Sequence, residues 1–171
     1  MPSLRPSQWP RSTQTNLPPG NPVRFSSGPF QHMLLALQAD AQLAIGKPEA
    51  ALGSVAAGLK AVEKTGGAPL KAELYRLRGE ALLAGAGTPS KAETAIERAI
   101  AVARRQNAKS WELRAATSLA RLRRQQGRPQ EAAALLAPIY AWFTEGLDTA
   151  DLRDAKALLD KLTEPAIAAE G

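Results

Sequence analysis

Apolar residues recur at intervals of three and four along most of the chain after residue 31, and polar residues fill the positions between them. This spacing places the apolar side chains on one face of an α-helix. Short clusters of glycine, proline and polar residues interrupt the pattern and end each helical stretch. We therefore expect seven helices, over residues 32–45, 48–64, 69–84, 89–105, 109–126, 129–145 and 149–164.

A Gly-x-Pro sequence occurs three times at almost equal spacing, with its glycine at Gly46, Gly87 and Gly127. Glycine commonly follows the end of a helix and proline commonly begins one. The glycines are 41 and 40 residues apart, and such a period is typical of helical repeat arrays. We expect an all-α fold, a right-handed α-solenoid of about three helix pairs with the seventh helix as a C-terminal cap. Such arrays generally bind other proteins.

The chain divides into three regions. Residues 1–30 contain seven of the thirteen prolines and have no periodic apolar pattern, so we expect a disordered or polyproline-like segment there. Residues 31–163 form the helical repeat domain. Pro165 stops the last helix, and residues 164–171 are expected to fray.

The composition excludes several kinds of functional site. The chain has no cysteine and one histidine, His32, which rules out disulfides, zinc–thiolate centres, thiol nucleophiles and metal sites built from imidazoles. We find no nucleophile–base pair and no carboxylates paired for acid–base catalysis. The sequence therefore predicts a protein that is not an enzyme, with no catalytic residue, metal or cofactor.

The sequence also bears on localisation. No apolar run approaches the roughly 18 residues of a membrane span. The N-terminus lacks the apolar core of a signal peptide. We expect a cytoplasmic protein that does not bind a membrane.

Charge is unevenly distributed along the chain, whose net charge is +6. Residues 98–128 contain nine basic residues and one acid, whereas residues 131–171 contain eight acids and three bases. The basic stretch has two interpretations: a docking face for an acidic protein or nucleic acid, and a solvated face whose cations favour a helix C-terminus. We favour the second, because no aromatic residues alternate with the arginines to stack on bases.

Two further groups of polar side chains need an interpretation. Asp148, Asp151 and Asp154 lack the spacing of a calcium loop, so helix capping is the better explanation. The glutamates near arginines on the predicted helix surfaces are interpreted as surface ion-pair partners: Glu73, Glu80 and Glu112 with Arg76, Arg78 and Arg114.

The first helix of each pair is expected to supply a concave face that binds peptides. The residues predicted to face a partner are Leu74, Tyr75, Arg78, Trp111, Arg114, Ser118 and Arg121. Among them, Arg78, Arg114 and Arg121 are expected to hold a carboxylate or an acidic segment. Trp142 falls off the apolar stripe of its helix and is predicted to be an exposed aromatic anchor.

The helix–Gly-x-Pro–helix unit, with small residues at fixed places, resembles a tetratricopeptide repeat. The resemblance is strongest over residues 72–80, 109–122 and 136–146 and covers roughly residues 31–163. The longer period is similar to that of the C-terminal repeat tail of bacterial signalling proteins. In those proteins a class III adenylate/guanylate cyclase domain, or a winged-helix DNA-binding domain, precedes a P-loop ATPase. The resemblance implies a sensor or interaction tail.

The chain departs from that family in what it lacks. It contains no G-x-x-x-x-G-K-[ST] phosphate loop, no cyclase domain and no winged helix. Three functional hypotheses remain open. The chain is an autonomous protein-interaction module, a truncated remnant of a signalling gene, or a helical domain that binds nucleic acid or a regulatory ligand through residues 98–128.

Overall fold

The computed structural model describes residues 30–65 and 69–164, and within these ranges the chain folds into helices with no strand. The helices are α1 (Gln31–Ala44), α2 (Pro48–Thr65), α3 (Lys71–Ala84), α4 (Pro89–Arg105), α5 (Lys109–Gln125), α6 (Pro129–Tyr140) and α7 (Ala150–Thr163). The prediction of an all-α protein is confirmed. The predicted N-terminal segment lies outside the described residues except for Phe30, and the predicted frayed end lies outside them except for Glu164.

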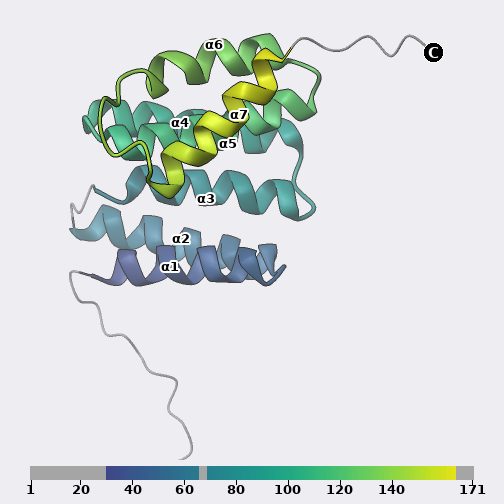
Figure 1. Ribbon diagram of the computed structural model, residues 1–171. Helices are drawn as coiled ribbons and strands as arrows, with labels where there is room; N and C mark the ends of the chain where they lie inside the picture. Colours follow the sequence, from purple (N-terminus) through teal and green to yellow (C-terminus); the bar gives the residue numbers. More distant parts are fainter. Residues whose placement is uncertain (1–29, 66–68, 165–171) are drawn as a thin grey trace, which may run out of the picture.

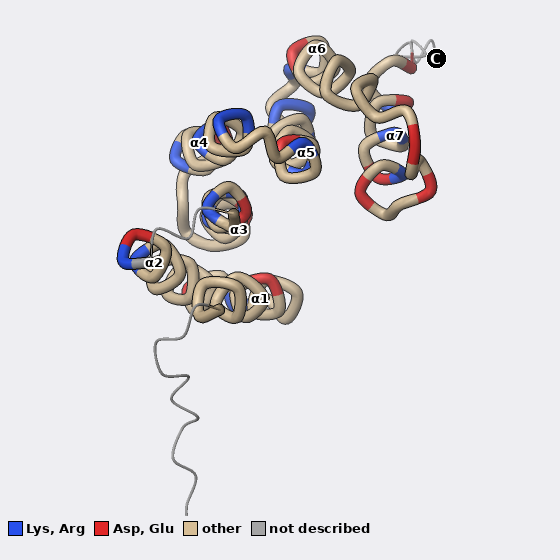
Figure 2. The backbone as a smooth tube through the Cα atoms, turned by 90° about the vertical axis from the view of Figure 1, so that its left-hand side faces the viewer, with Lys and Arg blue, Asp and Glu red and all other residues tan. Residues whose placement is uncertain are grey.

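Consecutive helices run back and forth and contact one another, from α1 to α7 (Figure 1). The odd-numbered helices are also in contact with each other, α1 with α3, α3 with α5 and α5 with α7. Within the described ranges, α2 does not contact α4, and α4 does not contact α6. Viewed end-on in Figure 2, the odd-numbered helices form a continuous curved layer. Helices α2 and α4 both lie on one side of this layer and do not contact each other.

The apolar side chains gather in two clusters that meet at α3. One cluster joins α1, α2 and α3 and includes Val55, Leu74 and Leu77. The other joins α3 to α7 and includes Tyr75 and Ile96. Because α3 supplies residues to both clusters, it is buried on nearly every side and connects the two halves of the molecule.

The prolines of the three Gly-x-Pro sequences begin helices, as predicted, whereas the three glycines differ from one another in their backbone conformation and surroundings. Pro48, Pro89 and Pro129 are the first residues of α2, α4 and α6. Gly46 and Gly127 have φ angles of +69° and +75°, a conformation that glycine adopts without steric cost. Gly87 is different, because a Cβ atom there would lie 2.5 Å from the carbonyl oxygen of Leu82.

The two helices of each pair meet at small residues. In the central pair, a Cβ atom on Gly79 would lie 2.3 Å from Cγ1 of Ile96 and 3.1 Å from the carbonyl oxygen of Ala92. The other two pairs have fully buried alanines near the corresponding places: Ala39 and Ala51 in the first, and Ala120 and Ala132 in the third. Small side chains thus allow the paired helices to approach closely.

The sixth helix is shorter than predicted, because it ends at Tyr140 and not at Gly146. The N–H group of Phe143 donates to the carbonyl oxygen of Tyr140 over 3.1 Å, and this tighter turn interrupts the α-helical pattern. Trp142 and Phe143 therefore lie in the loop before α7, with their rings edge-to-face and 5.0 Å apart. Trp142 is exposed, as predicted.

Candidate binding surface

The residues predicted to face a partner do not lie on one surface. Leu74, Tyr75 and Ser118 are buried, and Trp111 is half-buried. Leu74 packs in the cluster shared with α1 and α2, and Tyr75 packs in the other cluster. These side chains are part of the helix–helix packing and do not form one exposed face.

A network of hydrogen-bonded charges occupies the layer of odd-numbered helices. Arg76 donates to both carboxylate oxygens of Glu73, over 2.9 and 2.7 Å, and Arg114 donates to the same group over 3.0 Å. Glu80 accepts a hydrogen bond from the hydroxyl of Ser118 over 2.6 Å. These bonds join α3 to α5. Glu73 pairs with the nearby Arg76, as predicted, but its interpretation as a surface residue is wrong, because it is 6% exposed. Its second partner, Arg114, is 41 residues away.

Burial of Arg76 disfavours its positive charge, but the carboxylates around it outweigh this cost and raise the pKa of Arg76. Its nearest partner is Glu73, followed by Glu80 and Asp40. The guanidinium group is therefore ionised inside the protein. Its charge is compensated within the chain.

Arg78 is separated from the other two predicted arginines, Arg114 and Arg121. Arg121 pairs with Asp154, and Arg114 also lies 3.8 Å from Asp151, so both arginines connect α5 to acids of α7. Arg78 lies on the other side of α3. The predicted three-arginine clamp is thus not assembled, because two of its members are neutralised by carboxylates of the same chain.

Two of the three aspartates near the start of α7, Asp151 and Asp154, are partners of these arginines. The α7 helix begins after Thr149, whose side chain makes no capping hydrogen bond. Asp151 lies in the first turn of α7, where a negative charge favours the helix dipole. Within the described residues, no group of three or more histidines and acids is placed to hold a metal ion.

The hollow between α1, α3, α5 and α7 is small and polar. Its volume is about 190 Å³, and it is lined by Asp40, Arg76, Arg114, Thr117, Ser118, Arg121, Asp151 and Asp154. Together with Glu73 and Glu80 beneath it, the hollow has five carboxylates against three arginines. Since the arginines are already paired, this face is poorly suited to an acidic ligand.

A larger groove is lined by side chains of α2, α3 and α4. In Figure 2, α2 and α4 lie on the side of α3 away from α5 and α7. The groove consists of two adjoining hollows of about 630 and 570 Å³ that share Arg78 and Leu82. We call it the α2–α4 groove. Its lining residues are Leu52, Val55, Ala56, Leu59, Lys60, Glu63, Tyr75, Arg78, Leu82, Ser90, Lys91, Thr94, Ala95 and Arg98.

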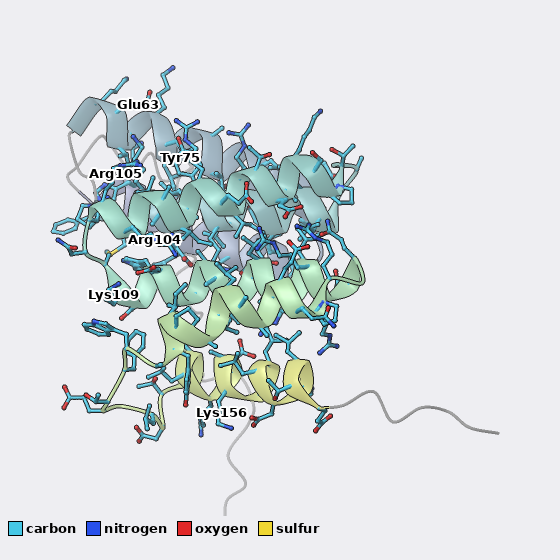
Figure 3. The ribbon with its side chains drawn as sticks, turned by 90° about the horizontal axis from the view of Figure 1, so that it is seen from above. Glu63, Tyr75, Arg104, Arg105, Lys109 and Lys156 are labelled. Atoms are coloured by element: carbon cyan, nitrogen blue, oxygen red, sulfur yellow. The ribbon has the colours of Figure 1, made fainter. Side chains whose placement is uncertain are left out.

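The α2–α4 groove combines apolar side chains with unpaired positive charge. Its cations are Lys60, Arg78, Lys91 and Arg98, and its one acid is Glu63. None of these four cations forms an ion pair in the described part of the chain, although the guanidinium of Arg98 lies 4.7 Å from the ring centre of Tyr75. Figure 3 shows that two residues of the groove, Glu63 and Tyr75, lie on the side of the molecule opposite to Lys156 of α7.

Most of the basic stretch 98–128 is paired within the chain. Six of its nine basic side chains form ion pairs with carboxylates: Arg104, Lys109, Arg114, Arg121, Arg123 and Arg128. Arg98 lines the α2–α4 groove. The stretch therefore does not form a continuous row of free cations that could follow a phosphate backbone.

Glu112 is a second buried carboxylate, at the junction of α4 and α5. It accepts hydrogen bonds from Arg104 over 2.7 Å and from Lys109 over 2.8 Å. Burial of Glu112 opposes its ionisation, but these hydrogen bonds and positive charges together outweigh burial and lower the pKa of Glu112. Its interpretation as a surface residue is wrong, because its side chain is buried against both partners.

This lowered pKa predicts a loss of stability in acid. A carboxyl group whose pKa is lower in the folded state contributes stability above its unfolded pKa, here 4.5, and loses it as the pH falls through the folded pKa. Urea unfolding from about pH 7 to about pH 3 should show a smaller acid-induced loss in Glu112→Gln than in the native chain. The exposed Glu63→Gln should leave this pH dependence unchanged, and an identical slope in Glu112→Gln would contradict the prediction.

No family model, no curated protein and no solved structure matches this chain. The resemblance to tetratricopeptide repeats thus depends on the Gly-x-Pro unit and on the three sequence stretches. None of the described helices has the length and apolar character needed to cross a membrane.

The sequence placed Tyr75 and Arg78, which both line the α2–α4 groove, among the binding residues but did not indicate the other lining residues. Leu59 and Leu82 belong to apolar helical stripes and look like ordinary core positions. A signal was nevertheless present. Lys60, Lys91 and Arg98 have no carboxylate three or four positions before them, which is the favourable orientation, and Glu63, three positions after Lys60, is the only one at that distance on the other side.

Proposed function

We propose that this chain is a non-catalytic protein-interaction module that binds an acidic segment of another protein in the α2–α4 groove. The proposal depends on one observation: the four cations of the groove have no carboxylate partner in the described chain and lie beside apolar side chains. Elsewhere in the described chain, most arginines pair with acids of the same molecule. Unpaired cations around apolar side chains favour a ligand that supplies both the carboxylates and the apolar contacts.

The shape of the groove favours a helical ligand. An amphipathic helix recognised in a groove between two helices places its apolar face on the floor and its charged flanks on the rims. Here Leu82 and Leu59 line the groove, and Lys60 and Lys91 stand on opposite helices. A partner helix with leucine or phenylalanine on one face and aspartate or glutamate on both sides of it fits this arrangement.

We further propose that the helix pairs are tetratricopeptide-like and form a short right-handed α-solenoid with α7 as its cap. Support comes from the Gly-x-Pro period and from the contacts between successive odd-numbered helices. The resemblance favours a role in the cytoplasm, in a bacterial signalling system of the cyclase–ATPase type. In that setting the module recruits a partner and performs no chemistry.

Selection from a phage-displayed library of random 16-residue peptides against the full chain tests this function. Enriched peptides should carry several acidic residues and apolar residues at i, i+3 and i+4. A synthetic peptide of the consensus should bind the native chain, and Arg78→Glu should weaken its affinity by about tenfold or more, because Arg78 borders both hollows. Fluorescence anisotropy measures the affinity.

Arg124→Glu is the matched control. It makes the same change of charge at an exposed residue of α5 that lies outside the α2–α4 groove, so peptide affinity should change little. Selected peptides without an acidic bias, or equal binding by Arg78→Glu and the native chain, would overturn the proposal.

A further inference from the structure

The outer face of α1 carries an apolar stripe that no other described helix covers. Its large members are Phe30, Met33, Leu34, Leu37 and Ile45, which are 65%, 41%, 37%, 61% and 66% exposed. They fall at helical spacing along one side of α1, together with the exposed Ala41. The opposite side of α1 contains Ala36 and Ala39, which pack in the first apolar cluster.

Comparison of α1 with α3 indicates that this stripe is a helix-packing surface. Both helices have 14 residues, so each residue of α1 corresponds to the residue 40 positions later in α3. Leu34, Leu37 and Ala41 then correspond to Leu74, Leu77 and Ala81 of α3. Those three residues are fully buried and form the contact of α3 with the preceding pair α1–α2. The stripe of α1 is therefore a helix-packing surface that lacks its neighbour.

The stripe is complementary to itself when two copies of α1 lie antiparallel. Rotation about a two-fold axis between Leu37 and Gln38 brings Phe30 opposite Ile45 and Leu34 opposite Ala41 of the second copy. Large side chains then meet smaller ones, and Leu37 of each copy lies at the centre. Such a self-complementary patch is what a two-fold symmetric interface requires.

Charge does not oppose this pairing. Between Phe30 and Ile45 the only acid or base other than His32 is Asp40. Asp40 borders the polar hollow beside Arg76, at the edge of the stripe. The contact therefore brings no like charges together at its centre, where apolar packing dominates.

We infer that the protein self-associates into a symmetric dimer through antiparallel packing of the α1 stripe against the α1 stripe of a second copy. This interface is separate from the α2–α4 groove and leaves that groove open. The dimer presents two copies of the proposed binding groove to a partner.

Sedimentation equilibrium of the full chain over a range of concentrations tests the inference. The native chain should show a monomer–dimer equilibrium. Leu37→Lys should weaken dimerisation by about tenfold or more, because it places a charge at the centre of the apolar contact. Leu147→Lys is the control, since Leu147 is also an exposed leucine, 47% exposed, but lies in the loop before α7. Circular dichroism confirms that both variants remain folded.

The absence of cysteine allows a direct test of the geometry. Leu37→Cys places one thiol on each copy next to the proposed two-fold axis, and a disulfide forms there only if the two Cα atoms come within about 7 Å of each other. Mild oxidation should yield a covalent dimer, whereas Ala137→Cys, exposed on α6, should stay monomeric. A native chain that is monomeric at all concentrations, a dimer insensitive to Leu37→Lys, or equal cross-linking of both variants overturns the inference. A monomer whose stripe binds a different protein also overturns it.

Discussion

Replacement of Glu73 by glutamine should lower the free energy of unfolding by about 3 kcal/mol or more. Glu73 is buried and accepts three hydrogen bonds, two from Arg76 and one from Arg114. Glutamine retains the shape of the side chain but removes its charge, so the buried guanidinium of Arg76 loses its principal counter-ion. A buried charge without compensation is much more costly than the loss of a surface pair. Urea denaturation followed by circular dichroism measures the change.

Asp160→Asn provides the comparison for Glu73→Gln. Asp160 pairs with Lys156 across one turn of α7, and both side chains are more than half exposed. Loss of such an exposed pair should leave the free energy of unfolding close to that of the native chain. If the two variants lose similar amounts of stability, the network around Glu73 is not a structural element of the fold.

Replacement of Gly79 by alanine should destabilise the protein by about 1–3 kcal/mol, although alanine is the better helix former. The added methyl group would lie 2.3 Å from Cγ1 of Ile96, whose side chain is fully buried and cannot move into solvent. It would also lie 3.1 Å from the carbonyl oxygen of Ala92. Helices α3 and α4 must therefore move apart. Thermal and urea unfolding should both report the loss.

Gly53→Ala is the matched control because Gly53 is also inside a helix. A Cβ atom there meets nothing within 4 Å. The variant should gain up to about 1 kcal/mol from helix propensity. Equal effects of the two substitutions would show that the approach of α3 to α4 does not limit the side chain at position 79.

The sequence was sufficient to predict the helices, since they follow from local information. The Gly-x-Pro spacing located the starts of α2, α4 and α6 to the residue. The end of α6 was not predicted, because Phe143 continues the apolar spacing of Ile139 and Tyr140 although the backbone has already turned. Local propensity does not distinguish these two conformations.

It was harder to predict which arginines are free to bind a ligand, because this depends on ion pairs between residues that are distant in the sequence. Glu73 and Arg114 are 41 residues apart, and Arg121 and Asp154 are 33 apart. From the sequence alone these arginines look free. Helix α3 adds a second difficulty. Residues on almost all of its sides are buried, so its apolar pattern does not reveal that Arg78 lies on the opposite side from Arg114.

The position of α3 in both apolar clusters bears on how the molecule unfolds. In a linear array each unit is held by its immediate neighbours. Helices α1 and α2 are joined to the rest of the described chain through α3 alone, whereas α3 retains its contacts with α4 and α5 when they detach. The first pair can therefore open as a separate cooperative unit with a free energy below that of global unfolding. Since α2 forms one wall of the α2–α4 groove, such opening would dismantle the groove while the other five helices remain folded.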